Sequence, residues 1–312
     1  MSTVFERTDA VRAAWPRIGD TLRSMWHTCV AAHQGADVAR ALTVNFVGLA
    51  DAGEKQALRL ATERLQTRTP CRAFLLLLGD EQATDQAEVA ATTRRTKSLR
   101  DIVLEEVVLH LRHQDLGRMP GLVRPLLVND LPNHLFWAAP WPADEAEFDA
   151  LAAMCSHVVV DSRRFGNPAR ELDVLAARRK QGKHITDLNW LRLRPWRRAL
   201  AEAFERVPWQ AGVRVKGVVR HGAKAAASTL LLTDWLHDRL GAALSIEPNG
   251  TSDSFAPEHV QLLLPGHEIV VDEHDGQLVV HITTEATCLL PLKLQASRAT
   301  DGDLLAAAID VA

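Results

Sequence analysis

Short runs of apolar residues, each followed by a helix-like stretch, are the strongest restraint on the fold of this chain. Arg72–Leu78 is one such run, and it closes at Gly79-Asp80. Leu42–Leu49 and Val158–Val160 are similar runs rich in β-branched residues. A strand that is apolar on both sides must be covered on both sides, which is the situation of strands in a parallel sheet. The sequence therefore predicts a parallel sheet with helices on both faces.

Helix patterns separate these strands. Lys55–Leu65, Asp144–Met154 and Ala169–Lys180 are predicted helices. Residues 1–40 also read as helical, and His134–Trp137 reads as a short strand. Together these elements predict a doubly wound, mostly parallel α/β sheet.

Two further segments of this half carry mixed signals. Ile102–Leu111 is predicted as a strand, although its charge spacing also permits a helix. Leu116–Leu127 is predicted as a helix that Pro120 and Pro125 interrupt.

The pattern changes after Glu205. Val213–Val219 is strand-like and Ser228–Leu240 is helical. A meander of short strands follows at Val260–Leu264, Glu268–Asp272, Gln277–Thr283 and Cys288–Leu294, with a hairpin turn at Asp275-Gly276 and a last helix that begins at Asp301. We therefore expect a Rossmann-like α/β domain without a dinucleotide fingerprint over residues 1–205. A smaller α+β domain with an antiparallel meander is expected over residues 206–312.

Composition and charge exclude several classes of protein. The chain has 312 residues and a formal net charge of −3, whereas a dedicated nucleic-acid binder normally carries a basic excess. The run from Ala73 to Gly79, the longest apolar one, is too short to cross a bilayer, and the N-terminus does not resemble a signal peptide. The four cysteines are scattered, without a C-x-x-C pair. We expect a cytoplasmic protein with no nucleic-acid or membrane partner.

The sequence contains none of the common catalytic or cofactor motifs. No G-x-G-x-x-G follows a predicted strand, and P-loop, G-x-S-x-G and H-E-x-x-H patterns are missing. Without a glycine-rich turn, a parallel α/β sheet cannot bring its backbone close to a pyrophosphate in the usual way. His110 and His113 have helical spacing but no third ligand nearby, so they are interpreted as surface histidines. No catalytic residue, cofactor or metal is expected.

Two tryptophans six residues apart mark the segment Asp187–Phe204, in a chain without tyrosine. Asp187 is expected to cap a short turn that carries Trp190, and Pro195 suits the start of a second helix. From Trp196 onward an apolar residue recurs every fourth position, which predicts one packing face. The two indoles either fill a seam between the domains or form a binding surface, because tryptophan and arginine are enriched at interface hot spots.

The run Asp187-Leu-Asn-Trp-Leu-Arg-Leu-Arg-Pro-Trp-Arg197 resembles the signature of the OpcA family, the glucose-6-phosphate dehydrogenase assembly proteins. Further blocks are similar to that family in the expected order, at Pro70–Leu77, at Leu122–Pro132 leading to Phe136-Trp137, and at Val158–Phe165. The resemblance implies a non-catalytic protein that binds glucose-6-phosphate dehydrogenase and acts as its allosteric activator in the pentose phosphate pathway. The partner-binding residues that it implies are Trp190, Arg192, Pro195, Trp196 and Arg197.

Basic residues outside the signature are candidate contacts for an anion or for an acidic partner surface. Arg94, Arg95, Lys97 and Arg100 form the densest basic run, and Arg163 follows a predicted strand. Alternatively, the run is a solvated loop, and Arg163 forms a structural salt link or turn with the aspartate two residues before it.

Two other functions remain open from sequence alone. The first is an α/β protein that binds, or acts as an enzyme on, a nucleotide or sugar phosphate at the strand ends near Asp51, Asp80 and Asp161. The second is an RNA-associated factor that uses the basic run Arg94–Arg100. Its support is this one basic run in a chain with a net negative charge.

Overall fold

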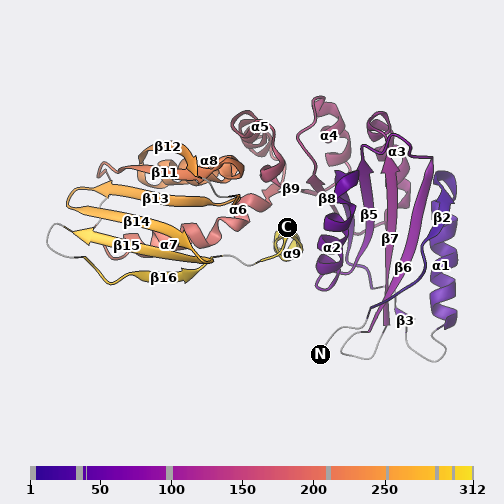
Figure 1. Ribbon diagram of the computed structural model, residues 1–312. Helices are drawn as coiled ribbons and strands as arrows, with labels where there is room; N and C mark the ends of the chain where they lie inside the picture. Colours follow the sequence, from indigo (N-terminus) through magenta and orange to yellow (C-terminus); the bar gives the residue numbers. More distant parts are fainter. Residues whose placement is uncertain are drawn as a thin grey trace. The chain divides into compact units, whose positions relative to one another are not determined.

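The computed structural model describes residues 5–32, 38–39, 41–95, 101–208, 212–250, 253–284, 288–296 and 299–310. The chain divides into two compact units, and each has its own sheet (Figure 1). Unit 1 comprises Met1–Val160, Gly182–Thr186 and Thr300–Ala312. Unit 2 comprises Asp161–Gln181 and Asp187–Ala299.

Unit 1 is built on a mostly parallel sheet. Neighbouring strands run parallel in the order β7 (Asp101–Leu111), β5 (Cys71–Leu78), β4 (Val44–Asp51), β8 (Asn133–Ala138) and β9 (His157–Val160), and β10 (Ile185–Asp187) lies beyond β9. Numbered along the chain, these strands have the order 3-2-1-4-5-6, which is that of dinucleotide-binding domains. The predicted doubly wound α/β sheet is confirmed.

Helices cover both faces of this sheet. In Figure 1, α2 (Lys55–Gln66) lies on one side of the strands and α1 (Ile18–Ala32) on the other. This cover is required because all eight residues of β5 are buried. A Cβ atom at Gly48 of β4 would lie 2.9 Å from Leu58 Cδ1, so the glycine allows α2 to pack closely on the strand.

The prediction of helix throughout residues 1–40 is wrong for the first part. β1 (Phe5–Arg7) and β2 (Val11–Ala14) pair antiparallel with β6 (Gln86–Arg95), which is itself antiparallel to β7. A short 3-10 turn, η1 (Trp15–Arg17), then leads into α1. β6 was not predicted because its alanines and its charged residues carry little strand signal of their own. It forms because β7 offers an edge to pair with.

The segment after β7 is helical but broken, as its two prolines require. Instead of one helix it forms η3 (His113–Arg118), α3 (Met119–Val123) and η4 (Arg124–Leu126). Pro120 lies in the first turn of α3 and Pro125 in η4, where a missing backbone N–H costs nothing. The remaining elements of unit 1 are β3 (Val38–Ala39), η2 (Ala52–Glu54) and α4 (Glu145–Ala152).

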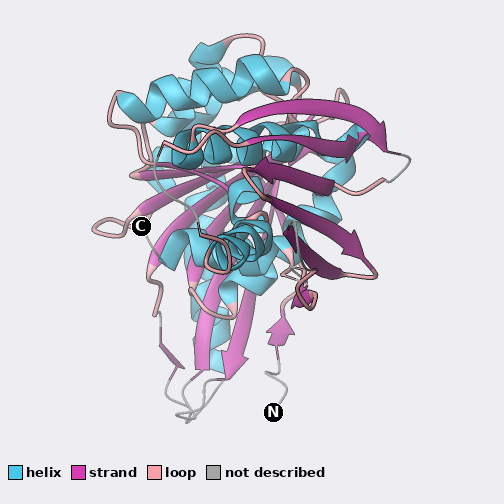
Figure 2. Cartoon of the chain, turned by 90° about the vertical axis from the view of Figure 1, so that its left-hand side faces the viewer, coloured by secondary structure: helices cyan, strands magenta, loops and turns pink. Residues whose placement is uncertain are grey.

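Unit 2 contains a six-stranded sheet with helices packed on one face (Figure 2). β11 (Lys216–Gly222) passes through η6 (Ala223–Ala225) and α8 (Ala226–Leu240) to the parallel strand β12 (Ala243–Gly250), which was not predicted. The antiparallel meander is confirmed, with β13 (Pro257–Leu264), β14 (His267–His274), β15 (Gln277–Thr284) and β16 (Leu292–Gln295). Asp275 and Gly276 have φ values of 52° and 74°, as a two-residue hairpin turn demands.

The units do not divide the chain at residue 205. Helices α5 (Pro168–Lys180), α6 (Leu188–Arg192) and α7 (Arg194–Phe204), with η5 (Ser162–Arg164), belong to unit 2, where α7 packs on β14, β15 and β16. The last helix, α9 (Asp301–Asp310), returns to unit 1 and packs on α2. In the part of the chain that the structure describes, no helix is both long enough and apolar enough to span a membrane.

Candidate functional site

The signature segment folds as two consecutive helices in unit 2. The Asp187 side chain accepts a hydrogen bond from the Asn189 backbone N–H at 2.9 Å and so caps α6. Pro195 lies in the first turn of α7. The predicted local structure of the segment is therefore confirmed.

Trp196 belongs to the core of unit 2. Its side chain is only 2% exposed, and it clusters with Leu200 and with buried residues of the six-stranded sheet. The indole is therefore not available for direct contact with a partner in this structure. Its role is to anchor α7 on the sheet, which in turn positions the more exposed residues of the segment.

Trp190 and Arg197 form a stacked pair across the two helices. The guanidinium carbon of Arg197 lies 3.6 Å from the centroid of the indole, and its Nη2 donates to the Trp190 carbonyl at 3.2 Å. Burial, together with the nearby charge of Arg194, lowers the pKa of Arg197 below its ordinary value. Both side chains of the pair remain partly exposed. A rigid aromatic face with a cation on it is typical of interface hot spots.

A buried carboxylate holds α6 in place. Asp161, directly after β9, is 1% exposed and accepts hydrogen bonds from two arginines. Arg163 donates through Nη2 at 2.6 Å, and Arg192 donates through Nη1 at 2.9 Å and Nη2 at 3.2 Å. Burial alone would raise the pKa of Asp161, but the hydrogen bonds and charges of the two arginines lower it overall. Arg163 therefore forms a structural salt link with Asp161, which was one of the two interpretations of this arginine. Arg192 is a second partner of Asp161 that the sequence did not reveal.

A second polar network lies next to this carboxylate. Asp187 Oδ1 accepts from the Ser162 backbone N–H at 3.1 Å, and Asn189 Nδ2 donates to Ser162 Oγ at 3.1 Å. Burial raises the pKa of Asp187, and hydrogen bonds from Ser162 and Asn189 offset part of that rise. Ser162 and Asn189 were not among the predicted site residues. The position of Asn189 inside the signature run was the available signal.

Phe255 extends the arginine contacts to the surface of unit 2. Its ring is 40% exposed, with the guanidinium carbon of Arg163 at 5.1 Å and Lys224 Nζ at 6.0 Å from the ring centroid. Arg163 thus contacts both a buried carboxylate and a partly exposed aromatic ring.

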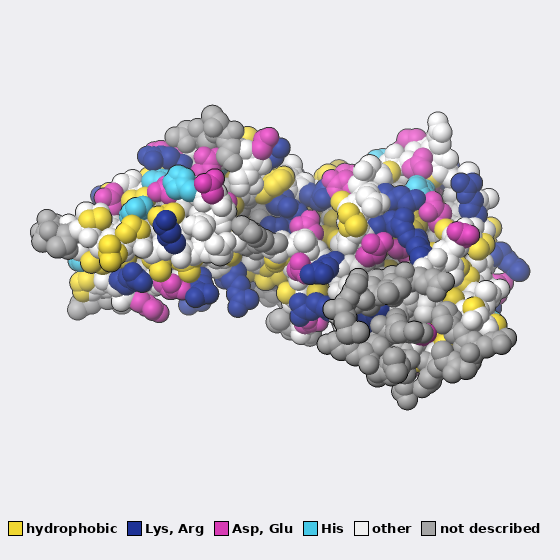
Figure 3. Space-filling model, turned by 60° about the horizontal axis from the view of Figure 1, so that its bottom comes forward, with side chains coloured by type: hydrophobic (Ala, Val, Ile, Leu, Met, Phe, Trp, Pro, Cys, Tyr) yellow, Lys and Arg dark blue, Asp and Glu magenta, His cyan; other side chains and the backbone are white. Residues whose placement is uncertain are grey.

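The predicted basic run, Arg94–Arg100, does not form a single basic patch among the described residues. Arg94 lies in β6 and its guanidinium donates to the Gln66 carbonyl, while burial lowers its pKa. Arg95 ends the same strand, and Lys97 and Arg100 lie outside the described residues. On the face shown in Figure 3, basic and acidic side chains are interspersed in both units. Arg94 and Arg163 belong to different units.

The turn after β4 is where a domain of this strand order would hold a pyrophosphate. Here that turn reads Asp51-Ala-Gly-Glu54, with one glycine and two carboxylates. Carboxylates repel phosphate, and a single glycine does not provide the close backbone approach of the glycine-rich fingerprint. The turn therefore does not fit a dinucleotide. Among the described residues, no group of three or more His, Cys, Asp or Glu side chains is arranged to hold a metal ion.

The fold defines a two-unit protein with the strand order of dinucleotide-binding domains but without their phosphate-binding turn. Residues 62–177 match the family model for the N-terminal domain of a glucose-6-phosphate dehydrogenase subunit, and residues 183–311 match the model for its C-terminal domain. These are the two domain models of OpcA. The chain belongs to the OpcA family.

Cyanobacterial relatives agree with this assignment. The chain is 31% identical over 188 residues to an OxPP cycle protein OpcA of Nostoc punctiforme, a match that covers 58% of this chain and 40% of the relative. A second OpcA, of Synechocystis, is 31% identical over 147 residues, covering 46% of this chain and 31% of the relative. The matched region is thus less than half the length of these relatives.

A solved structure shares the fold. A mutant of KijD10, a 3-ketoreductase from Actinomadura kijaniata in complex with TDP-benzene and NADP, matches with a TM-score of 0.50 and 11% identity. The match covers 86% of this chain and 88% of the reductase. At this identity the likeness concerns the fold alone.

Proposed function

We propose that this protein binds glucose-6-phosphate dehydrogenase and favours its active conformation or oligomer, without catalysing a reaction itself. The single observation that carries the proposal is the pair of family models, both named for that dehydrogenase, over residues 62–177 and 183–311. The sequence lacks the common catalytic motifs, and the β4–α2 turn does not fit a dinucleotide. These features support an accessory role rather than an oxidoreductase activity.

The stacked Trp190–Arg197 pair is the proposed centre of the contact. Arg192 holds α6 through Asp161, and Pro195 and Trp196 hold α7, so the pair lies on two fixed helices. A preorganised aromatic anchor loses little entropy on binding. Arg94, Arg95, Lys97, Arg100 and Arg163 are proposed as secondary contacts for an acidic partner surface.

Activation requires only a modest difference in affinity. A partner that binds the active form of the enzyme ten- to a hundredfold more tightly shifts its equilibrium by about 1.4–2.7 kcal/mol. No nucleotide hydrolysis is needed for such a shift. We propose that this action takes place in the cytoplasm, in the pentose phosphate pathway.

The proposal is tested with the dehydrogenase of the same organism. NADPH production is measured with and without this protein, and the mixture is analysed by size-exclusion chromatography. Co-elution with a change in activity or oligomer size is the expected result. Failure to co-elute, together with unchanged activity of a folded and active enzyme, would overturn the proposal.

Matched variants then locate the contact. Combining Trp190→Ala with Arg197→Ala should weaken binding by more than about tenfold, because a hot-spot pair contributes roughly 2 kcal/mol or more. Arg198→Ala is the control, since that side chain is 70% exposed on the same helix and pairs only with Glu202 among its described ion pairs. Equal binding by both variants would remove the pair from the contact surface.

A further inference from the structure

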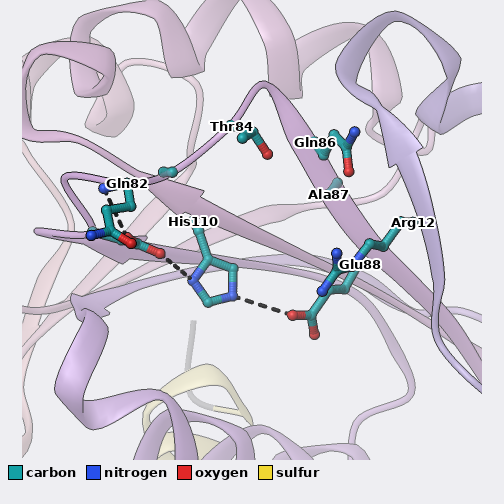
Figure 4. A pocket seen from close by; sticks show the side chains of 9 residues that line it. Arg12, Gln82, Thr84, Gln86, Ala87, Glu88 and His110 are labelled. Atoms are coloured by element: carbon teal, nitrogen blue, oxygen red, sulfur yellow. Dashed lines mark hydrogen bonds and ion pairs between the residues drawn. The ribbon is translucent and has the colours of Figure 1, made fainter.

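A polar pocket lies at the carboxyl edge of the unit 1 sheet (Figure 4). Its volume is about 320 Å³, and it lies where β5 and β7 end and β6 begins. The polar side chains that line it include Arg12, Asp80, Gln82, Gln86, Glu88 and His110. Ligands of open α/β sheets bind outside the carboxyl ends of the strands, and small-molecule pockets begin at roughly 300 Å³. The pocket therefore lies at the edge of the sheet where ligands bind and has the volume of a small-molecule site, although it is away from the switch point between β4 and β8.

His110 is the centre of an ion network in this pocket. Its Nδ1 lies 3.2 Å from Asp80 Oδ2 and its Nε2 lies 3.3 Å from Glu88 Oε1, so the ring lies between two carboxylates (Figure 4). Lys55 Nζ donates to both oxygens of Glu88, at 2.9 and 3.0 Å, and lies 3.2 Å from His110 Nε2. Burial alone would raise the pKa of Glu88, but the hydrogen bond and charge of Lys55 lower it. The interpretation of His110 as a plain surface histidine is thus incomplete.

The network is held by separate elements and is still accessible. Lys55 begins α2, Asp80 follows β5, Glu88 lies in β6 and His110 lies near the end of β7. The side chains of Asp80, Glu88 and His110 are 35%, 32% and 29% exposed. A fixed but accessible set of polar groups is what recognition of a small polar molecule needs.

The lining selects a ligand rich in hydroxyl groups. Carboxylates only accept hydrogen bonds, whereas the amides of Gln82 and Gln86 both donate and accept. A hydroxyl also does both, so a polyol satisfies all of these groups at once. No phenylalanine, tyrosine or tryptophan is found among the described residues that line the pocket, so a nucleotide base would have no large aromatic side chain to stack on.

The charges of the lining disfavour a phosphate group. Asp80 and Glu88 contribute two negative charges, and Arg12 is the only lysine or arginine among the described lining residues. Arg12 is exposed, on the edge strand β2. A dianion would therefore meet two carboxylates, with Arg12 as the available cation, because Lys55 already donates to Glu88 and faces His110. A carboxylate could still pair with that arginine at the rim.

We propose that this pocket binds a neutral or singly charged polyhydroxylated molecule about the size of a monosaccharide. Its hydroxyl groups donate to Asp80 and Glu88 and accept from the two glutamines, while His110 positions the two carboxylates. A carboxylate, where the ligand has one, pairs with Arg12. This binding goes beyond the proposed function and does not depend on the dehydrogenase.

Binding is tested on this protein alone, without the dehydrogenase, by saturation-transfer NMR and calorimetry. The probes are D-glucose, D-gluconate, glucose 6-phosphate, inorganic phosphate and NADP⁺. Glucose or gluconate should bind, and phosphate alone should not. Asp80→Asn should weaken binding by about tenfold or more, because a hydrogen bond to a charged acceptor is stronger than one to a neutral acceptor.

The controls separate this site from others. Asp85→Asn is the matched control, because Asp85 is in the same connection, is 54% exposed and pairs with Arg112 and Arg118 outside this pocket. His110→Ala, checked for folding by circular dichroism, should weaken binding as Asp80→Asn does. Absence of glucose and gluconate binding at millimolar concentration would overturn the proposal. So would preferential binding of phosphate or NADP⁺, or equal binding by the Asp80 and Asp85 variants.

Discussion

Acid should destabilise unit 1 through a group of three histidines near the amino ends of β8 and β9. His134 Nδ1 and His157 Nδ1 lie 3.4 Å apart, and the rings of His157 and His184 are 4.5 Å apart. His134 and His157 are 4% and 1% exposed. Burial, and then the charges of His184 and His134, lowers the pKa of His157 from 6.5 to about 4. Burial and His184 also lower the pKa of His134.

The magnitude follows from proton linkage. Because the folded pKa of His157 is lower than the unfolded one, the unfolded state binds the proton first as the pH falls. The contribution of His157 is present above pH 6.5 and is lost between pH 6.5 and about 4. A change from 6.5 to about 4 corresponds to a loss of about 2 kcal/mol by pH 5 and about 3 kcal/mol by pH 4. His134 acts in the same direction.

Urea unfolding at pH 7 and pH 5 measures this loss, and hydrogen exchange of residues 133–160 assigns it to unit 1. His157→Gln cannot take up the proton, so its free energy of unfolding should fall by about 2 kcal/mol less over this interval than that of the unmodified protein. His27→Gln, at an exposed position of α1, is the control and should keep the full pH dependence. Identical pH dependence in His157→Gln and the unmodified protein would refute the reasoning.

Three further predictions concern other parts of the molecule. Asp161→Asn leaves two arginines without their shared carboxylate and should lower the free energy of unfolding of unit 2 by about 2–4 kcal/mol, measured by urea titration. A loss below about 0.5 kcal/mol would contradict a structural role for Asp161. Gly302→Val should loosen α9 and speed its hydrogen exchange, because a Cβ atom there would lie 2.8 Å from the Ala61 carbonyl oxygen. Unchanged protection of the α9 amides from exchange would contradict this packing. With iodoacetamide at pH 8, the exposed Cys288 should react before Cys71, because burial raises the pKa of the Cys71 thiol to about 12. Equal reaction rates for Cys288 and Cys71 would contradict the burial of Cys71.

Elements that carry their own periodic signal are predictable from the sequence. β5 is apolar without interruption from Ala73 to Leu78, α2 has its apolar residues on one face, and Asp275-Gly276 marks a hairpin turn. Each signal lies within a dozen residues and reflects which side chains must be buried. β6 and β12 were missed because pairing with a neighbouring strand, rather than their own composition, makes them strands.

Only the local structure of the candidate site could be predicted from the sequence. The cap at Asp187 and the helix start at Pro195 are local and could be foreseen. The contact of Arg192 with Asp161 joins residues 31 positions apart, so no spacing rule could reveal it. The burial of Trp196 depends likewise on a sheet that forms later in the chain.

The class of the fold, the family and the local structure of the signature can all be read from the order of the residues, because they depend on periodicity, turn chemistry and motif. Which unit each helix joins depends instead on packing in three dimensions, since α7 finds its apolar partners on the second sheet, α6 packs against α8 and α7, and α9 finds its partner on α2. The same packing selects which polar residues meet. Lys55, Asp80, Glu88 and His110 come from four different elements, and they form one network because the neighbouring order β6-β7-β5-β4 brings the start of β6 and the ends of β7, β5 and β4 to the same edge.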